Sequence, residues 1–174
     1  MPTVTIRPNG VESSAGFDVS GATLVSRVND NDTGTIATQI STTCEATFTL
    51  ANDSSYSGAT INSIRLSVTG RTAGKASSCQ ATCKIVNASD TDLQATDHTF
   101  GTTLSQEDGA EYTTSLTPTI VDGLKIVIDP DSAGMVLAEV FLVVNYTATA
   151  VTTTTPFIGL RSGKYKIVAG KIKI

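Results

Sequence analysis

The only histidine of the chain, His98, is the first residue to test for acid–base chemistry. Asp97 precedes it, which would suit an orienting carboxylate in a Ser–His–Asp triad. Such a triad also needs a serine held on a sharp turn, and the chain contains no Gly-x-Ser-x-Gly motif. We therefore expect His98 to be a surface or loop histidine, and the sequence predicts no catalytic residue and no enzyme.

Paired aspartates offer a second kind of chemistry, because two carboxylates two residues apart can share a hard cation such as Ca²⁺. The best candidate is the run Asp30–Gly34, in which Asn31 and the glycine can curl the chain. It lacks the later ligands of an EF-hand loop, and hydrogen bonding within Asx turns explains the same residues. We expect no metal site, and without a glycine-rich phosphate loop we expect no cofactor.

The three cysteines, at positions 44, 79 and 83, are an odd number. Cys79 and Cys83 would lie about 13 Å apart on one strand, whereas a disulfide needs Cα atoms within about 7 Å; in a hairpin or turn they could approach. Zinc binding by two cysteines and the single histidine would lack a fourth ligand. We expect small, buried, reduced thiols.

Carbohydrate chemistry is weakly indicated. A glycosidase needs two carboxylates about 5–9.5 Å apart, and any acidic β-protein offers such pairs on paper. Sugar sites usually also present aromatic platforms, and here aromatic residues are 5% of the chain with no tryptophan. A strong carbohydrate-binding module is therefore disfavoured, and a weak one stays open, with its ligand in the loops near Asp30, Asp53 or Asp90.

The composition of the chain favours β-structure. The 174 residues suit one domain with a single core. They include 29 threonines and 17 serines, and threonine suits the half-exposed surface of a sheet. The N-terminal residues lack the basic and apolar stretches of a signal peptide, and no apolar run approaches the ~20 residues of a membrane span. We expect no membrane association.

Charge divides the chain into two parts. Residues 1–160 carry seven basic and sixteen acidic side chains, a net charge of −9, and residues 161–174 carry five basic side chains and no acid. The acidic body should be repelled by nucleic acid, since phosphate binding depends on positive charge. The basic terminus suits an acidic surface.

Alternation of apolar and polar residues dominates the chain, as in Ile64–Thr69 and Thr47–Leu50, with glycine- and aspartate-rich turns between. Short strands at this spacing predict an all-β fold, an antiparallel β-sandwich of jelly-roll or immunoglobulin-like type. The predicted strands are 2–7, 22–28, 35–41, 44–51, 60–70, 80–87, 98–104, 110–116, 124–129, 136–149 and 163–173. Segments such as Pro8–Gly10 and Asp122–Gly123 are predicted turns.

A threonine-rich stretch ending at Pro156 separates the sandwich, residues 1–149, from a C-terminal segment, residues 150–174. That segment is an extended arm or, alternatively, a final strand of the same sheet. Its alternating pattern would place lysines on one face and isoleucines on the other. The predicted partner-binding residues are Arg161, Lys164, Lys166, Lys171, Ile172, Lys173 and Ile174.

Four segments give the chain a likeness to known proteins: Thr3–Gly10, Tyr112–Pro118, Asp122–Ile128 and Glu139–Tyr146. With them, residues 1–149 resemble the small β-sandwich virion structural proteins of tailed bacteriophages, of the head decoration or cement type. The resemblance implies a capsid decoration protein that stabilises the head by binding the shell of major capsid protein. A homotrimer on the virion surface, synthesised in the host cytoplasm, is the corresponding expectation. The alternative is a glycan-binding receptor module on the tail or capsid.

Overall fold

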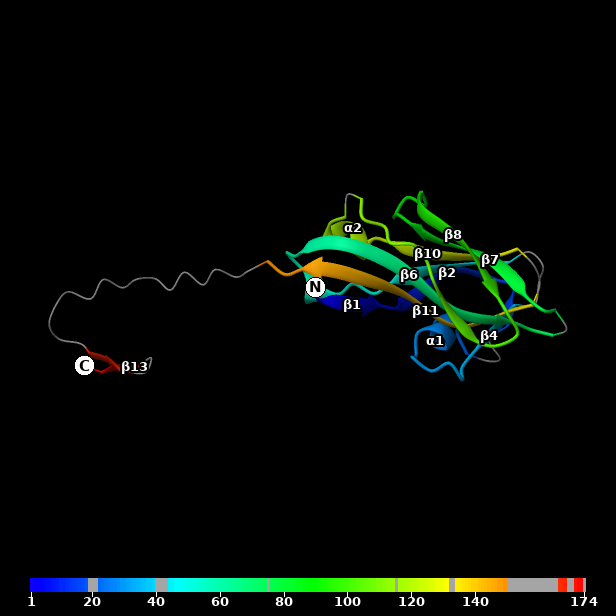
Figure 1. Cartoon of the computed structure of the whole chain (residues 1–174), viewed down its shortest axis with the longest axis horizontal. Helices are drawn as coiled ribbons and strands as arrows, with labels where there is room; N and C mark the ends of the chain where they lie inside the picture. The colour runs from blue at the N-terminus through cyan, green and yellow to red at the C-terminus, as the bar shows by residue number, and fades with distance from the viewer. Residues whose placement is uncertain are drawn as a thin grey trace.

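The structure, a computed structural model, describes residues 1–18, 22–39, 44–74, 76–114, 116–131, 134–149, 166–168 and 171–173. Residues 1–149 carry two antiparallel sheets whose strands run side by side (Figure 1). The predicted all-β antiparallel sandwich is thereby confirmed. Among the described residues, no helix is long and apolar enough to cross a bilayer.

The first sheet is built around its longest strands, β6 (Thr60–Thr72) and β11 (Met135–Thr147), which pair along almost their whole length. On the far side of β6 lies β9 (Ser105–Asp108). On the far side of β11 two strands share one edge. The early part of β11 pairs with β4 (Ala37–Gln39), which pairs in turn with β3 (Phe17–Asp18), and the later part pairs with β1 (Thr3–Ile6).

The second sheet has the strand order β2-β5-β10-β7-β8. Its central strands are β5 (Glu45–Leu50), β10 (Lys125–Pro130) and β7 (Cys79–Val86). Its edges are β2 (Pro8–Ala15) and β8 (Asp92–Phe100). Every neighbouring pair in this sheet is antiparallel. Because a β-strand is pleated, consecutive side chains alternate between the core and the outer face.

The core lies between the two sheets and is filled by their inward-facing side chains. Phe48, Ile85 and Ile126 of the second sheet and Leu66 and Leu142 of the first are buried to 2% exposure or less. Full burial of one such side chain contributes about 1.5–3 kcal/mol. All three cysteines are buried and free, as expected. Burial raises the pKa of the Cys83 thiol to about 12, so this thiol is unreactive at neutral pH.

One predicted strand, 22–28, is instead a short helix, α1 (Leu24–Val28). Thr23 and Ser26 cap it reciprocally, each hydroxyl accepting a hydrogen bond from the other residue's backbone N–H. Leu24 and Val28 are one helical turn apart and both buried. The β-branched residues of this segment favoured a strand, and the cap with the helical spacing of the two apolar residues outweighs that preference.

Other boundaries also differ from the prediction. The predicted turn Pro8–Gly10 begins β2, where irregular pairing accommodates a proline at a sheet edge. Of the predicted strand 98–104, only residues 98–100 are strand, as the end of β8, and β9 was not predicted. In place of the strand 110–116, one bridge joins Tyr112 to Ile64. The helix α2 (Pro118–Asp122) follows and is capped by Thr117. A 3-10 turn, η1 (Ser54–Tyr56), lies between β5 and β6.

The predicted C-terminal strand 163–173 is two strands, β12 (Lys166–Val168) and β13 (Lys171–Lys173). They pair with each other, with Ile167 opposite Ile172. Within the described residues neither is hydrogen-bonded to the two large sheets. The choice between an arm and a final strand of the sandwich stays a prediction. The predicted partner residues Arg161, Lys164 and Ile174, and the threonine-rich stretch 150–156, lie outside the described residues.

Candidate functional site

A groove on the outer face of the first sheet combines an ion pair, an aromatic ring, hydroxyls and amides. Its volume is about 280 Å³, close to the lower end of the range for small-molecule sites, about 300–1,000 Å³. Strands of the first sheet, the chain after β1 and the loop after α1 all contribute to it. Its lining residues are Thr5, Arg7, Asn31, Thr33, Thr69, Gln106, Glu139 and Phe141.

The register of the sheet places these side chains in rows. Glu139 of β11 lies opposite Thr69 of β6, which lies opposite Gln106 of β9. A β-bulge between Leu137 and Glu139 resets the alternation of β11. As a result Glu139 and Phe141 line the outer groove, while Val140 and Leu142 belong to the core.

Arg7 holds the groove together. Its Nη1 donates to Oε2 of Glu139, and its Nη2 donates to Oδ1 of Asn31 over 2.8 Å. The guanidinium carbon lies 5.3 Å from the centre of the Phe141 ring, within the range of a cation–π contact. Arg7 therefore joins residues from β11 and from the loop after α1 in one arrangement.

Glu139 is the most unusual residue of the groove, because a carboxylate on an outer sheet face is normally solvated. It is only 4% exposed. Its Oε2 is paired with Arg7, and its Oε1 is buried with no hydrogen-bond partner among the described residues. A buried acceptor left without a donor costs about 1–3 kcal/mol, so this oxygen is poised to accept a hydrogen bond.

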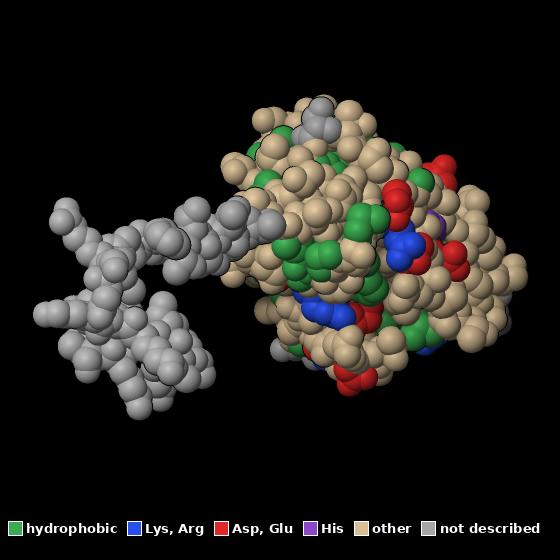
Figure 2. All heavy atoms as spheres, turned by 60° about the vertical axis from the view of Figure 1, so that its left-hand side comes forward, with side chains coloured by type: hydrophobic (Ala, Val, Ile, Leu, Met, Phe, Trp, Pro, Cys, Tyr) green, Lys and Arg blue, Asp and Glu red, His purple; other side chains and the backbone are tan. Residues whose placement is uncertain are grey.

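Half-buried apolar side chains continue this face along β11. Phe141 and Val143 lie between the ion pairs Arg7–Glu139 and Arg65–Asp108, the second with a separation of 3.3 Å. A space-filling view shows one face on which hydrophobic side chains gather between two groups of neighbouring basic and acidic side chains (Figure 2). The face thus offers apolar contact flanked by polar groups.

The loop 29–36 supports one wall of the groove. Asn31 has a positive φ of 59°, a conformation that asparagine tolerates better than most residues. Asp30 Oδ1 accepts from the backbone N–H of Asp32 over 3.0 Å, and the hydroxyl of Thr35 holds the pKa of Asp30 below its usual value. These Asx-turn hydrogen bonds are those expected from the run Asp30–Gly34. No group of three or more metal-ligating side chains occurs among the described residues.

Asp53 and Asp90, the other two predicted ligand-binding positions, border different cavities. Asp53 lies at one end of the sandwich in a cavity of about 570 Å³, where the buried Tyr56 donates to Asp122 over 2.5 Å. Burial, assisted by Asp122, raises the pKa of Tyr56. Asp90 borders a cavity of about 340 Å³ over the second sheet and bonds to Lys125. The three predicted loops are therefore not brought together into one site.

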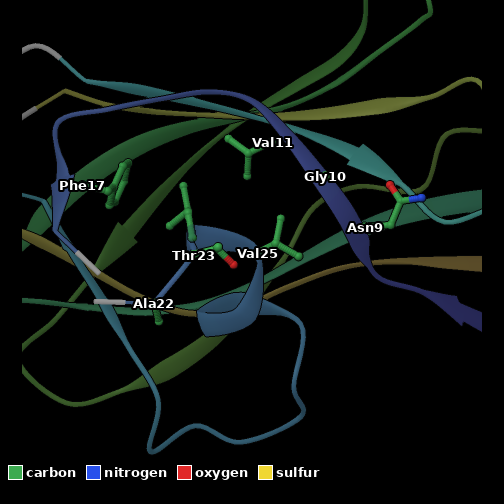
Figure 3. Close-up of a pocket in the computed structure, with 8 residues that line it drawn as sticks. Asn9, Gly10, Val11, Phe17, Ala22, Thr23 and Val25 are labelled. Carbon is green, nitrogen blue, oxygen red and sulfur yellow. The ribbon is translucent and has the colours of Figure 1, made fainter. Parts of the chain in front are cut away.

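A fourth cavity, of about 540 Å³, lies between β2 and α1. Val11, Phe17 and Val25 border it, together with the polar side chains of Asn9 and Thr23 (Figure 3). None of its described lining residues is titratable. It offers both apolar and polar contact but, from these residues, no group for acid–base chemistry.

His98 is not the surface or loop residue that was expected. It lies on β8, is 6% exposed, and its Nε2 has no hydrogen-bond partner among the described residues. Its ring packs near Phe100. Burial lowers the pKa of His98, although Glu107 and other nearby carboxylates oppose that shift. No described serine donates a hydrogen bond to His98. Its burial therefore does not conflict with the expectation that the chain has no Ser–His–Asp triad.

The decisive groove residues Arg7, Glu139 and Phe141 were not among the predicted site residues. Glu139 did carry a signal: it is the only charged residue in the otherwise apolar run 135–144. Arg7 and Phe141 gave none, because their role depends on a contact between residues 132 positions apart.

No protein-family model matches the chain, and no curated protein does. Two solved carbohydrate-binding modules are similar in fold. One is the C-terminal CBM6 of the laminarinase LamC from Zobellia galactanivorans, with a TM-score of 0.48 and 9% identity, covering 83% of this chain and 99% of that one. The other is CBM6cm-2 of Cellvibrio mixtus lichenase 5A, with a TM-score of 0.44 and 11% identity, covering 83% and 98%.

A third similar structure is the arabinose-bound α-L-arabinofuranosidase MgGH51. Its TM-score is 0.44 and its identity 14%, and the match covers 75% of this chain and 23% of that one. At these identities the likenesses concern the fold alone. They do not indicate the function of this chain.

Proposed function

We propose that this chain is a non-catalytic module that binds carbohydrate, with the ligand in the groove over the first sheet. The observation that carries the proposal is the buried Oε1 of Glu139, which has no hydrogen-bond partner among the described residues. Glu139 lines a groove whose other lining groups are hydroxyls, amides, one guanidinium and one aromatic ring.

Carbohydrate fits this set of groups better than other small ligands. Each sugar hydroxyl both donates and accepts, so neighbouring hydroxyls can meet a carboxylate and the amides of Asn31 and Gln106 at once. The C–H face of a sugar ring supplies apolar contact, which a half-buried aromatic ring such as Phe141 can match. Phe141 is the kind of aromatic platform whose scarcity argued against a strong module.

The groove does not resemble the arrangement that glycoside hydrolysis needs. That reaction uses two carboxyl groups on opposite sides of the scissile bond. The described lining includes one carboxylate, Glu139, and its Oε2 is already paired with Arg7. This supports binding without turnover.

The test is binding of the purified chain to a glycan array, with Glu139→Gln and a matched control. Glu12→Gln is that control, because Glu12 is 45% exposed and bonds to Lys125 over the second sheet, away from the groove. The native chain and the control should bind the same glycans, and Glu139→Gln should lose them. Binding to no glycan, or equal binding by Glu139→Gln, would refute the proposal.

Capsid decoration, the function implied by the resemblance to phage proteins, is the second candidate. The observation in its favour is that β12 and β13 pair with each other rather than with the sandwich, within the described residues. A basic hairpin outside the sandwich suits contact with an acidic partner surface. Deleting residues 157–174 and measuring co-sedimentation with capsids tests it, since unchanged binding removes this segment from the mechanism. The trimer and the major capsid protein as partner stay predictions.

A further inference from the structure

The charges in the groove are balanced. Its described lining contains one cation, Arg7, and one anion, Glu139, and the two are paired. The remaining lining residues are threonines, amides and Phe141. The lining therefore carries no net charge of its own that would attract a ligand of either sign.

An acidic sugar would disturb this balance. Its carboxylate would compete for Arg7, whose two terminal nitrogens already bond to Glu139 and Asn31. If Arg7 turned to the ligand, Glu139 would stay buried without a counter-charge, which is strongly unfavourable. If Arg7 stayed in place, the ligand carboxylate would lie near Glu139 and be repelled.

An amino sugar meets the opposite obstacle. Its ammonium group could approach Oε1 of Glu139, but it would then lie close to the guanidinium of Arg7, which bonds to the same carboxylate. Like charges at close range in a partly buried site repel. The attraction of the ammonium group to Glu139 is thus offset by its repulsion from Arg7.

An uncharged hydroxyl leaves the ion pair intact and supplies the missing donor. We infer that the groove selects uncharged sugars and that Oε1 of Glu139 accepts a hydrogen bond from a ligand hydroxyl, an inference that rests on the proposed function. A hydrogen bond to a charged group contributes about 1.5–3 kcal/mol, which is about tenfold or more in affinity.

Entry of that hydroxyl requires a small shift of the groove wall, because Glu139 is only 4% exposed. The Arg7 side chain is 25% exposed, and besides its pair with Glu139 it bonds to Asn31 of the loop 29–36. We expect the shift to occur in this loop, so that the Arg7–Glu139 pair and the strands of the first sheet stay in place.

The experiment is calorimetric titration of the native chain, at neutral pH, with three forms of one oligosaccharide that binds on the array. The forms are the neutral sugar, its C6-oxidised uronate and its 2-amino counterpart. The neutral form should bind at least about tenfold more tightly than either charged form. In Glu139→Gln the groove keeps Arg7 without its counter-charge, so the preference should shift toward the uronate. Glu12→Gln should retain the native order.

The outcomes separate the two proposals. Absence of binding to any glycan refutes the proposed function. Binding in which the native chain prefers the uronate or the amino sugar, or does not distinguish the three forms, refutes this inference and leaves the proposed function standing. Because the order of affinities is measured on the native chain, the test does not depend on the folding of Glu139→Gln. Circular dichroism shows whether Glu139→Gln is folded, and its change in preference is interpreted only if it is.

Discussion

Replacing Arg7 by methionine should destabilise the fold far more than a surface substitution does. The change leaves Glu139, whose side chain is 5% exposed, without its cation. Breaking a buried ion pair by removing one partner costs about 3–5 kcal/mol, and the partial exposure of Arg7 places this case near the lower end, about 3 kcal/mol. Loss of the contact with Phe141 adds about 0.5–1 kcal/mol.

The complementary change, Glu139→Met, should cost less, about 1–2 kcal/mol. It leaves the guanidinium of Arg7, which is 25% exposed and keeps its bond to Asn31, so the remaining charge reaches water. Lys125→Met is the control. Its partners Glu12 and Asp90 are 45% and 69% exposed and regain solvent, so the loss should be smaller than for either groove variant.

Urea unfolding at neutral pH measures these free energies, and thermal unfolding should show a fall of about 7–16 °C for Arg7→Met, since each kcal/mol shifts the midpoint by about 2–4 °C at this size. The order Arg7→Met, Glu139→Met, Lys125→Met is the essential result. If Lys125→Met costs as much as Arg7→Met, or Glu139→Met costs more, then burial of the surviving carboxylate does not determine the loss and the reasoning fails.

Three further predictions concern other parts of the fold. Because burial lowers the pKa of His98 below about 6.5, the unfolded chain takes up the proton first as pH falls, so stability should drop below about pH 6.5. His98→Gln should weaken that drop in urea midpoints measured from pH 5 to 8, and an unchanged drop assigns it to other groups. Tyr56→Phe removes the 2.5 Å hydrogen bond to Asp122 and should cost about 1.5–3 kcal/mol in urea unfolding, with a loss under 0.5 kcal/mol counting against that bond. Gly70→Ala should cost about 1–3 kcal/mol, since its Cβ would lie 3.0 Å from the carbonyl oxygen of Val136, and native-like thermal stability would show that β6 and β11 can separate slightly.

The fold was predictable from sequence because its main signal is local. Alternation in segments such as Thr47–Leu50 and Ile64–Thr69 identified β5 and β6, and β7, β10 and β11 were placed within two residues at each end. The failures occurred where local signals conflict. Residues 24–28 have β-branched side chains together with a helix cap, and only packing of the short helix against the sandwich decides between them.

The groove could not be predicted, because its chemistry depends on pairing between distant segments. The bulge at Ala138 decides that Glu139 faces outward, and a one-residue change of register would turn it toward the core. Nothing local to residue 7 indicates that its side chain lies beside β11. The one usable sign was a carboxylate within an apolar run, which is a general mark of a position where stability alone did not choose the residue.

The same sign leads to a test that joins stability with function. If Glu139 and Arg7 served to hold the first sheet together, replacing both by apolar residues of similar size should make the chain less stable than native. Replacing a buried ion pair in this way often leaves the stability of a protein unchanged or raises it by about 1–4 kcal/mol, because the two charges no longer have to be desolvated. Arg7→Met/Glu139→Leu should therefore unfold at a urea concentration equal to or above that of the native chain, since the orphaned Oε1 is removed along with its partner. It should at the same time bind no glycan. A double variant that is stable and still binds would show that the ligand contacts other groups, whereas one that is as unstable as Arg7→Met would show that the pair is needed by the fold itself.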